Sequence, residues 1–459
     1  MHATSGQAVE YAVPQGSARR GRWLAAVLTA SLALRLAFSF FWPGSVEWSD
    51  AKGYHELALN ILHDGTFPTA FYAPGYPAFV AAIYALFGEQ HLPVLIVQSV
   101  LGTLGVWVTY LTGSDALGRA RSGMALLAAA LFGLSPGVAY YSAWLLREGV
   151  LVLLIPLLAW LCLRMLQRTW RYAVPLGLTA GALAYVRLEG GLLVAVMLVL
   201  GLLHKRWRRR AIGGGLLAGA IAVAGAAPWV VYCSLARGYA SMQVSLGPNL
   251  FARTWHLSPT GEVEPELRRQ VLDRIAELGL SERQQRDWDV AGAILVETPA
   301  DDLPSWLELN RRLTAIAWEN SRRHPLGYLA TLPLDMLRTM GGEPFTWWQT
   351  RWVPSLAELR RDRHWGVLAL RLFNHAVWPA VVLPLVLGGA AWAVWRRDRS
   401  AGALITLLVA VSVCILAMTM LATKGEARYR VPYDGLLYLA MGVGFAAATR
   451  RIRALPTAP

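Results

Sequence analysis

Apolar stretches alternate with polar connections along most of the 459-residue chain. Most of these stretches are about 18 residues long or longer, which is enough for a helix to cross a hydrocarbon core of about 30 Å. They lie at about 23–42, 93–112, 123–141, 148–166, 172–187, 190–204, 211–232, 374–394, 401–422 and 431–449. The pattern predicts an all-α polytopic membrane protein with about ten transmembrane helices.

The basic residues of the connections gather on one side of this arrangement. If the spans alternate, one side carries the clusters at 19–22, 119–121, 164–171, 205–210, 396–399 and 450–453. Short cytoplasmic loops carry an excess of Lys and Arg, so this side is predicted to be the cytoplasm, with both termini in it. The formal net charge of +14 reflects these loops and does not require nucleic-acid binding.

The opposite side carries two long polar segments. In the first outer loop, residues 43–92, apolar side chains recur at helical spacing from Tyr54 to Leu62, and a second short juxtamembrane helix is expected from Pro77 to Phe87. The segment 233–373 is too polar to span a membrane, and helical spacing recurs in it. The expected organisation is a cytoplasmic tail (1–22), a transmembrane core (23–232), an extracytoplasmic, mostly helical segment (233–373), C-terminal transmembrane helices (374–449) and a second tail (450–459).

Cysteine and histidine usage offers no support for a metal centre. Cys162, Cys233 and Cys414 lie within or at the end of apolar stretches, and the chain has no CxxC pair or Cys/His cluster. The histidines also lack the spacing of metal ligands. We therefore expect neither a disulfide framework nor a structural zinc site, and no cofactor requirement. A divalent metal has no support from the sequence.

Asp50 is the first candidate for chemistry, because it places a carboxylate just beyond the end of the first span. A carboxylate near the lipid headgroups is costly unless it is paired or solvated. One interpretation makes Asp50 a general base that takes a proton from an acceptor hydroxyl. The other makes it the N-cap of the following helix. The sequence leaves the two open.

Further charged residues gather on the same side. Arg147 and Glu148 open a span, either as a pair that caps a helix or as an anion-binding residue beside one that orients substrate. Arg187 and Glu189 occupy a tight turn, as a structural ion pair or as part of a polar pocket. A third group contains Lys424, Arg428 and Arg430.

These last three basic residues oppose the positive-inside trend. They fit either a snorkelling loop or a lipid phosphate, which Arg binds through paired hydrogen bonds and Lys as a point charge. Arg35 lies within the first span and has no assigned role. Together, the cations could stabilise charge on a leaving phosphate while a carboxylate deprotonates a nucleophile.

The order of these motifs resembles the GT-C superfamily of integral-membrane glycosyltransferases. The similarity is to the branch of dolichyl-phosphate-mannose–protein mannosyltransferase-like and aminoarabinose-transferase-like bacterial enzymes. The motifs are Asp50-x3-Tyr54, Leu57-Ala58-x2-Ile61-Leu62 with Gly65, Pro74-Gly-Tyr-Pro77, Arg147-Glu148, Arg187-Leu-Glu189-Gly, His324-Pro325-x2-Tyr328-Leu329 and Arg428-Tyr-Arg430.

This resemblance implies many membrane helices, two juxtamembrane helices in the first outer loop, and inverting transfer of a sugar from a polyprenyl-phosphate donor. Asp50 matches the acidic residue proposed as base, and Glu148 would position substrate or assist it. The donor phosphate would bind Arg147, Lys424, Arg428 and Arg430, beside a pocket of Tyr54, Tyr76, Arg187 and Glu189. The expected acceptor is an envelope lipid, polysaccharide or protein at the outer face of a bacterial inner membrane.

A lipid or polysaccharide transporter is the alternative function, since ten spans with buried charges would also suit it. Transporters more often show paired inverted repeats with broken helices at the midplane. In this sequence the polar groups gather at one face instead. A non-catalytic envelope scaffold is a third interpretation.

Overall fold

The structure is a computed structural model that describes most of the first three-fifths of the chain and two later segments. The described residues are 15–41, 43–44, 49–117, 122–187, 207–257, 303–332 and 427–442, with isolated positions between 195 and 273. The expected spans at 374–394 and 401–422 lie outside them. The span at 190–204 is described only at isolated positions, and the last span only up to residue 442.

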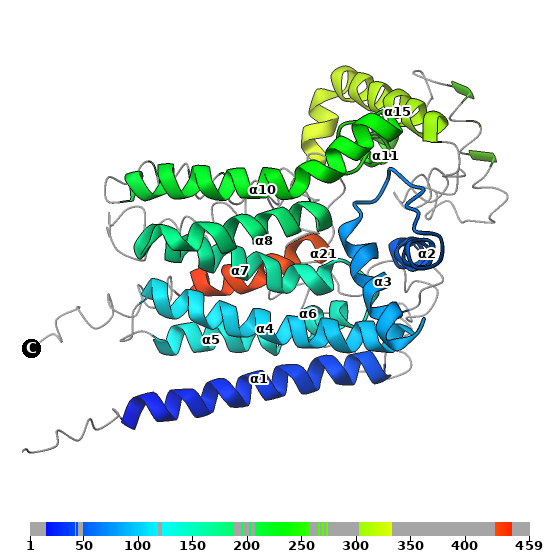
Figure 1. Cartoon of the computed structure of the whole chain (residues 1–459). Coiled ribbons are helices and arrows are strands. Elements are labelled where there is room, and N and C mark those ends of the chain that lie inside the picture. The colour runs from blue at the N-terminus through cyan, green and yellow to red at the C-terminus, as the bar shows by residue number, and fades with distance from the viewer. Residues whose placement is uncertain are drawn as a thin grey trace, which may run out of the picture.

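Five long or moderately long helices lie side by side and form a bundle (Figure 1). They are α1 (Gln15–Phe41), α4 (His91–Leu117), α7 (Glu148–Gln167), α8 (Ala173–Val186) and α10 (Arg208–Arg237). Within the described residues, four helices are long and apolar enough to cross a membrane, at 19–41, 91–117, 148–167 and 208–237. The predicted all-α polytopic class is therefore confirmed.

The predicted span at 123–141 is a bent pair of helices. Helices α5 (Ser122–Gly133) and α6 (Pro136–Ser142) meet at an angle of 55° and count as a fifth span if they are taken together. Proline has no N–H for the helical ladder, so α5 cannot run straight through Pro136. Proline is favoured at the start of a helix, and Ser135 caps α6 by accepting a hydrogen bond from the Val138 amide.

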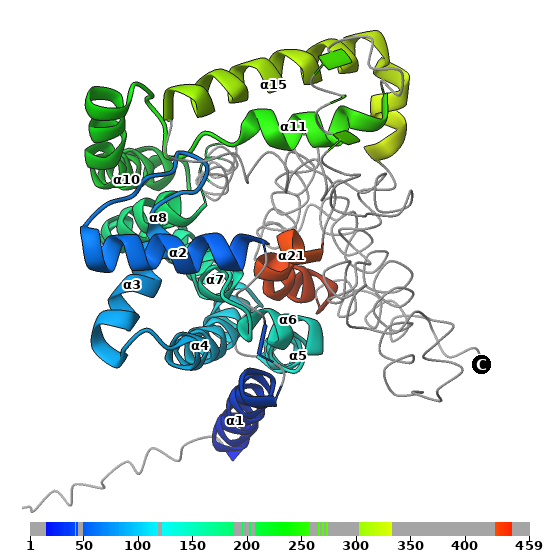
Figure 2. The same cartoon turned by 90° about the vertical axis from the view of Figure 1, so that its right-hand side faces the viewer.

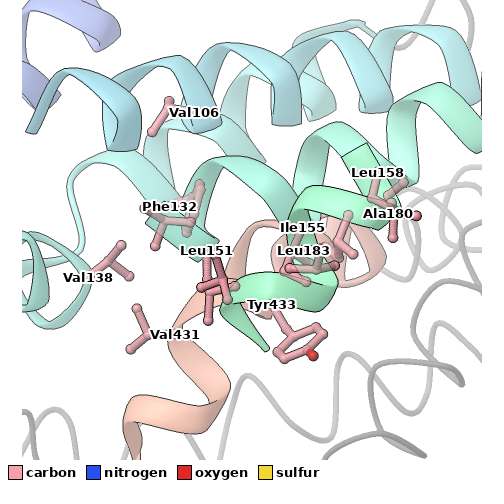
Figure 3. Close-up of a cluster of buried hydrophobic side chains, with 14 of the residues drawn as sticks. Val106, Phe132, Val138, Leu151, Ile155, Leu158, Ala180, Leu183, Val431 and Tyr433 are labelled. Atoms are coloured by element: carbon pink, nitrogen blue, oxygen red, sulfur yellow. The ribbon is translucent and has the colours of Figure 1, made fainter. Parts of the chain in front are cut away.

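The core of the bundle lies around α7. Leu151, Ile155 and Leu158 of α7 are fully buried and pack with Phe132 of α5 and Leu183 of α8 (Figure 3). The segment from Val431 to Tyr433 packs against α7 in the same cluster, although it is distant in sequence. The last predicted span therefore begins against α7, the central helix of the core.

The first outer loop forms two helices at one end of the bundle (Figures 1 and 2). Helix α2 spans Ser49–Asp64 and crosses this end, and α3 spans Gly75–Phe87. Both predicted juxtamembrane helices are thus present. Helix α2 begins five residues earlier than the apolar pattern suggested, which places Asp50 in its first turn. We call this end of the bundle the loop end.

Part of the predicted extracytoplasmic segment also lies at the loop end. Helix α11 (Leu246–Thr254) packs against α15 (Leu303–Arg323) through Phe251, Leu313 and Ile316. The segment contacts the first outer loop through a backbone hydrogen bond of 2.6 Å from the Val244 amide to the Ala70 carbonyl. Residues 267–278 of this segment, where apolar positions also recur at helical spacing, fall mostly outside the described residues.

Basic residues mark the opposite end of the bundle, which we call the basic end. Arg210, at the start of α10, donates to the carbonyl oxygens of Leu166 and Gln167, at the end of α7. At the loop end, Arg237 finishes α10 and donates to the carbonyl oxygen of Pro68. The described helices therefore alternate as the sequence predicted, with the first outer loop at one end and basic clusters at the other.

Candidate active site

Asp50 is held by a tyrosine from the far side of the first outer loop. The Tyr72 hydroxyl donates a hydrogen bond of 3.1 Å to Asp50 Oδ1. The Tyr72 ring passes close to Gly53, where a Cβ atom would lie 2.8 Å from the ring. Glycine at this position lets the tyrosine reach across α2. Asp50 is the second residue of α2 and therefore does not occupy the N-cap position, although an acid in the first turn suits the positive end of the helix dipole.

Three aromatic rings continue from Asp50 into the bundle. The Tyr72 and Tyr54 ring centroids are 4.9 Å apart, and those of Tyr54 and Tyr76 are 4.7 Å apart. Tyr76 is buried, and its hydroxyl donates to Oε1 of Gln98 over 2.6 Å. Burial raises the pKa of Tyr76 well above its usual range, and neighbouring Tyr54 and Glu148 raise it further. Glu148 thus lies near this ladder of rings.

Glu148 is the first residue of α7 and is almost completely buried, with 1% of its surface exposed. Among the described residues, neither of its carboxylate oxygens has a hydrogen-bond partner. The preceding Arg147 is partly buried and provides no side-chain cap for the helix. Burying an unpartnered polar group costs about 1–3 kcal/mol, and more when the group is charged. The helix dipole offsets part of this cost, because its positive end is at Glu148.

Two buried arginines reach the same end of the bundle from distant parts of the chain. The guanidinium carbon of Arg187, which follows α8, lies 4.9 Å from the centre of the Tyr429 ring. Arg430 is the last residue of the short helix α21 (Ala427–Arg430), and its Nε donates to Asp434 Oδ1 over 2.8 Å. The structure therefore brings the Arg187 motif against the Arg428-Tyr-Arg430 motif, as one shared site requires.

Asp434 is a site residue to which the sequence analysis gave no role. It is completely buried, and its second oxygen, Oδ2, has no hydrogen-bond partner among the described residues. The available signal was the spacing of Arg430 and Asp434, because residues four apart meet on one face of a helix. Of the remaining predicted residues, Arg428 is described only as part of α21, and Lys424 and Glu189 lie outside the described residues.

The predicted residues that are described converge at the loop end. Helix α3 packs against α8, which ends beside Arg187, and α7 begins with Glu148 at the same end. Three carboxylates (Asp50, Glu148 and Asp434), three arginines and a ladder of tyrosines therefore lie at this end of the bundle. In the part of the chain that the structure describes, no group of three or more His, Cys, Asp or Glu side chains could hold a metal ion.

The fold matches solved structures of an archaeal oligosaccharyltransferase. An oligosaccharyltransferase of Archaeoglobus fulgidus in complex with Zn and sulfate is 13% identical, with a TM-score of 0.53 over 94% of this chain and 49% of that chain. AglB of the same organism, in complex with an inhibitory peptide and a dolichol-phosphate, is 12% identical, with a TM-score of 0.51 over 96% and 52%. ArnT from Cupriavidus metallidurans, bound to undecaprenyl phosphate, is 15% identical over 95% and 80%, with a TM-score of 0.39.

This chain shares the fold of these archaeal oligosaccharyltransferase structures and spans about half their length. Residues 72–232 match the family model of the dolichyl-phosphate-mannose-protein mannosyltransferases. The resemblance to GT-C glycosyltransferases and to their mannosyltransferase-like branch is therefore confirmed. No curated protein matches the chain.

Proposed function

We propose that this protein is an extracytoplasmic glycosyltransferase. It would move a hexose or pentose from a polyprenyl-phosphate-linked donor to a cell-envelope lipid, polysaccharide or protein. The observation that carries the proposal is the convergence of Asp50, Glu148, Arg187 and Arg430 at the loop end of an apolar bundle. The family match and the dolichol-phosphate bound in the structure of archaeal AglB agree with a donor of this class.

Asp50 is the proposed general base. Its carboxylate takes the proton of the acceptor hydroxyl while that oxygen attacks the anomeric carbon of the sugar. The bond from this carbon to the phosphate oxygen breaks with inversion, and the polyprenyl phosphate leaves with the bonding electrons. The hydrogen bond from Tyr72 fixes the orientation of Asp50 relative to α2. Glu148 assists by positioning substrate from the start of α7.

The arginines stabilise the charge that develops on the leaving phosphate. Guanidinium groups match phosphate oxygens through paired hydrogen bonds, and these bonds strengthen in a site that excludes water. Arg147, Arg428, Arg430 and Lys424 are the proposed phosphate-binding residues. Arg187, Tyr54, Tyr76 and Glu189 form the proposed pocket. No metal or cofactor is required in this proposal.

The location follows from the two ends of the bundle. The basic end fits the cytoplasmic face by the positive-inside rule, so the loop end would face the outer side of a bacterial inner membrane. The donor phosphate would then sit at headgroup depth beside α2 and α3. Both chain termini would lie in the cytoplasm, as the alternation of spans predicts.

The test is transfer of radiolabelled sugar from polyprenyl-phosphate donors into envelope fractions. It compares membranes that contain equal amounts of wild-type protein, Asp50→Asn or Asp64→Asn. Asp64 is the matched control, because it is exposed at the opposite end of α2. We expect Asp50→Asn to lose transfer while it retains donor binding, and Asp64→Asn to behave as wild type.

Equal transfer by Asp50→Asn and wild type would contradict the assignment of the base. Absence of transfer from every donor by the wild-type protein would contradict the proposed function itself. A lipid-translocation assay in vesicles would then test the transporter alternative.

A further inference from the structure

Gln98 joins three separate segments with one buried amide. It lies in the third turn of α4 and is completely buried. Its Oε1 accepts from the Tyr76 hydroxyl over 2.6 Å, and its Nε2 donates to the carbonyl oxygens of Ser142 at 3.1 Å and Trp144 at 2.8 Å. Backbone carbonyls can only accept, so the amide nitrogen must face them. Both N–H groups and the carbonyl oxygen of the side chain are thus engaged.

The segments that Gln98 joins are those that carry the two carboxylates. Tyr76 belongs to the first outer loop and packs on Tyr54. Tyr54 in turn packs on Tyr72, whose hydroxyl donates to Asp50. Ser142 is the last residue of α6, and Trp144 lies in the connection from α6 to α7, which leads to Glu148. Gly149 lies directly against the Gln98 side chain, since a Cβ there would be 2.5 Å from its amide carbon.

The α6–α7 connection is also held from its other side. Arg35 of α1 is completely buried and donates from Nη1 to the Ser142 hydroxyl. The Gly44 amide, after the end of α1, donates to the Ala143 carbonyl over 2.7 Å. A buried charge within a membrane span is costly and usually has a defined partner. Arg35 therefore has an assignable role: it anchors the connection that Gln98 binds.

We infer that Gln98 is a positioning residue, which fixes the Asp50-bearing outer loop against the Glu148-bearing start of α7. Its effect on catalysis rests on the proposed function, whereas its effect on the two segments does not. Reacting groups must be held to within a fraction of an ångström, and a misplacement of about 1 Å can reduce the rate on the order of 100-fold. A link between the two carboxylate-bearing segments is suited to set this geometry.

The structural part of the inference is tested by hydrogen–deuterium exchange on the full chain in lipid nanodiscs. Gln98→Met keeps an unbranched side chain of similar length but removes all three hydrogen bonds. We expect backbone amides of residues 70–80 and 142–150 to exchange about tenfold faster, as expected for loss of buried hydrogen bonds. Faster exchange confined to α4, or no change in either segment, would overturn the inference.

Ser99→Ala is the matched control, because it removes a buried polar group from the neighbouring position of α4. The Ser99 hydroxyl bonds to Leu95 and Ser39, and neither belongs to the two joined segments. Exchange in residues 70–80 and 142–150 should therefore stay at the wild-type rate. An equal increase of the exchange rate in Ser99→Ala would overturn the inference, because the loss of any buried polar side chain from α4 would then have the same effect.

The catalytic part is tested by steady-state transfer. We expect Gln98→Met to lower kcat on the order of 100-fold with KM for the donor within about threefold of wild type. Tyr76→Phe removes only the hydroxyl, keeps the ring packing, and remains informative if Gln98→Met fails to fold. Because both variants remove the same hydrogen bond, the double variant should be no slower than Gln98→Met.

The outcomes separate the two proposals. Unchanged kcat in Gln98→Met, a loss in KM alone, or additive losses in the double variant would overturn the positioning role. If wild-type protein transfers no sugar, the proposed function fails, and the exchange experiment still decides whether Gln98 holds the two segments together.

Discussion

A largely buried carboxylate lies at each end of α7, and only one of the two has hydrogen-bond partners among the described residues. At the basic end, the largely buried Asp115 accepts from Arg164 Nε and from Trp160 Nε1, and Arg168 lies 3.7 Å away. At the loop end, Glu148 is buried without a hydrogen-bond partner among the described residues. Buried polar groups are nearly always satisfied in native proteins, so an exception calls for an explanation. The difference is the one expected if the basic end serves stability and the loop end carries the proposed chemistry.

The backbone groups at the two ends of α7 also differ in how they are capped. At the basic end, Arg210 donates to the carbonyl oxygens of Gln167 at 2.7 Å and Leu166 at 3.2 Å. Two of the last carbonyl oxygens of α7, which lack partners within the helix, therefore have a donor. At the loop end, Arg147 occupies the N-cap position without a side-chain cap, and the Gly149 and Val150 amides bond to the backbone carbonyl oxygens of Leu146 and Arg147. The two helix ends therefore differ in how they are capped: by a side chain of α10 at the basic end, and by backbone carbonyls at the loop end.

Glu148→Gln should have a large effect and should separate function from stability. We expect transfer to fall about 100-fold, because the neutral amide cannot replace the carboxylate in positioning substrate. Thermal stability should stay constant or rise, since an amide is cheaper to bury than an unpartnered carboxylate. The measurements are the transfer rate and the unfolding midpoint from tryptophan fluorescence. A lower unfolding midpoint with unchanged transfer would show that Glu148 contributes to stability and not to function.

Arg430→Met should destabilise the loop end through Asp434. Removing the cation leaves a completely buried carboxylate without its hydrogen bond, which costs about 3–5 kcal/mol for a buried pair. Thermal unfolding of the purified protein measures the loss. Adding Asp434→Asn should recover part of the stability, because it removes the uncompensated charge. No recovery in the double variant would show that the Arg430–Asp434 bond is not the source of the loss.

Asp115→Asn should weaken the basic end by about 1–3 kcal/mol, because the charge-assisted bonds to Arg164 and Trp160 are lost. Lys52→Met is the comparison, since it breaks an exposed pair with Glu56 at 3.8 Å. Exposed pairs contribute from about 0 to 1 kcal/mol. Unfolding midpoints measured side by side should therefore rank Asp115→Asn well below Lys52→Met. Equal midpoints would mean that the Asp115 network adds little to stability.

A smaller, pH-dependent effect is expected at His55 in α2. Its Nδ1 lies 3.0 Å from the Tyr84 hydroxyl and 3.4 Å from His91 Nε2. Burial lowers the pKa of His55, and the carboxylates of Glu56 and Glu89 oppose this shift. The unfolded chain then binds a proton more readily than the folded one, so stability is full above about pH 6.5 and falls as the pH drops below it.

The measurement is the unfolding midpoint of wild type and His55→Asn between pH 7.5 and about 5. We expect the wild-type midpoint to fall toward acid pH, and the variant to lose part of that fall. Parallel curves for the two proteins would exclude His55 as a source of the pH dependence.

The sequence predicted most of the fold because membrane spans depend on a simple local rule. Length and hydropathy located α7 and α8 to within one residue and α4 and α10 to within five, whereas α1 begins eight residues before the predicted span. Helical spacing likewise located α2 and α3. The bend between α5 and α6 was missed, because a proline inside an apolar stretch does not reveal by itself whether a span continues.

The candidate site was predicted only where residues had a motif to mark them. Asp50, Glu148 and Arg187 stood out as charges beside apolar stretches, and the structure places them at one end of the bundle. Gln98 gave no such signal, because a single glutamine in an apolar span is indistinguishable from an ordinary packing residue. Its partners, Tyr76 and the carbonyl of Trp144, are brought to it only by tertiary packing.

The most direct test of the account is sugar transfer by purified protein in proteoliposomes that contain a polyprenyl-phosphate sugar and an envelope acceptor. Wild type, Asp50→Asn and Asp115→Asn would be compared at equal amounts of folded protein. We expect transfer by wild type and Asp115→Asn, and none by Asp50→Asn. Transfer by Asp50→Asn at the wild-type rate, or its loss only in Asp115→Asn, would contradict the claim that the loop end carries the chemistry.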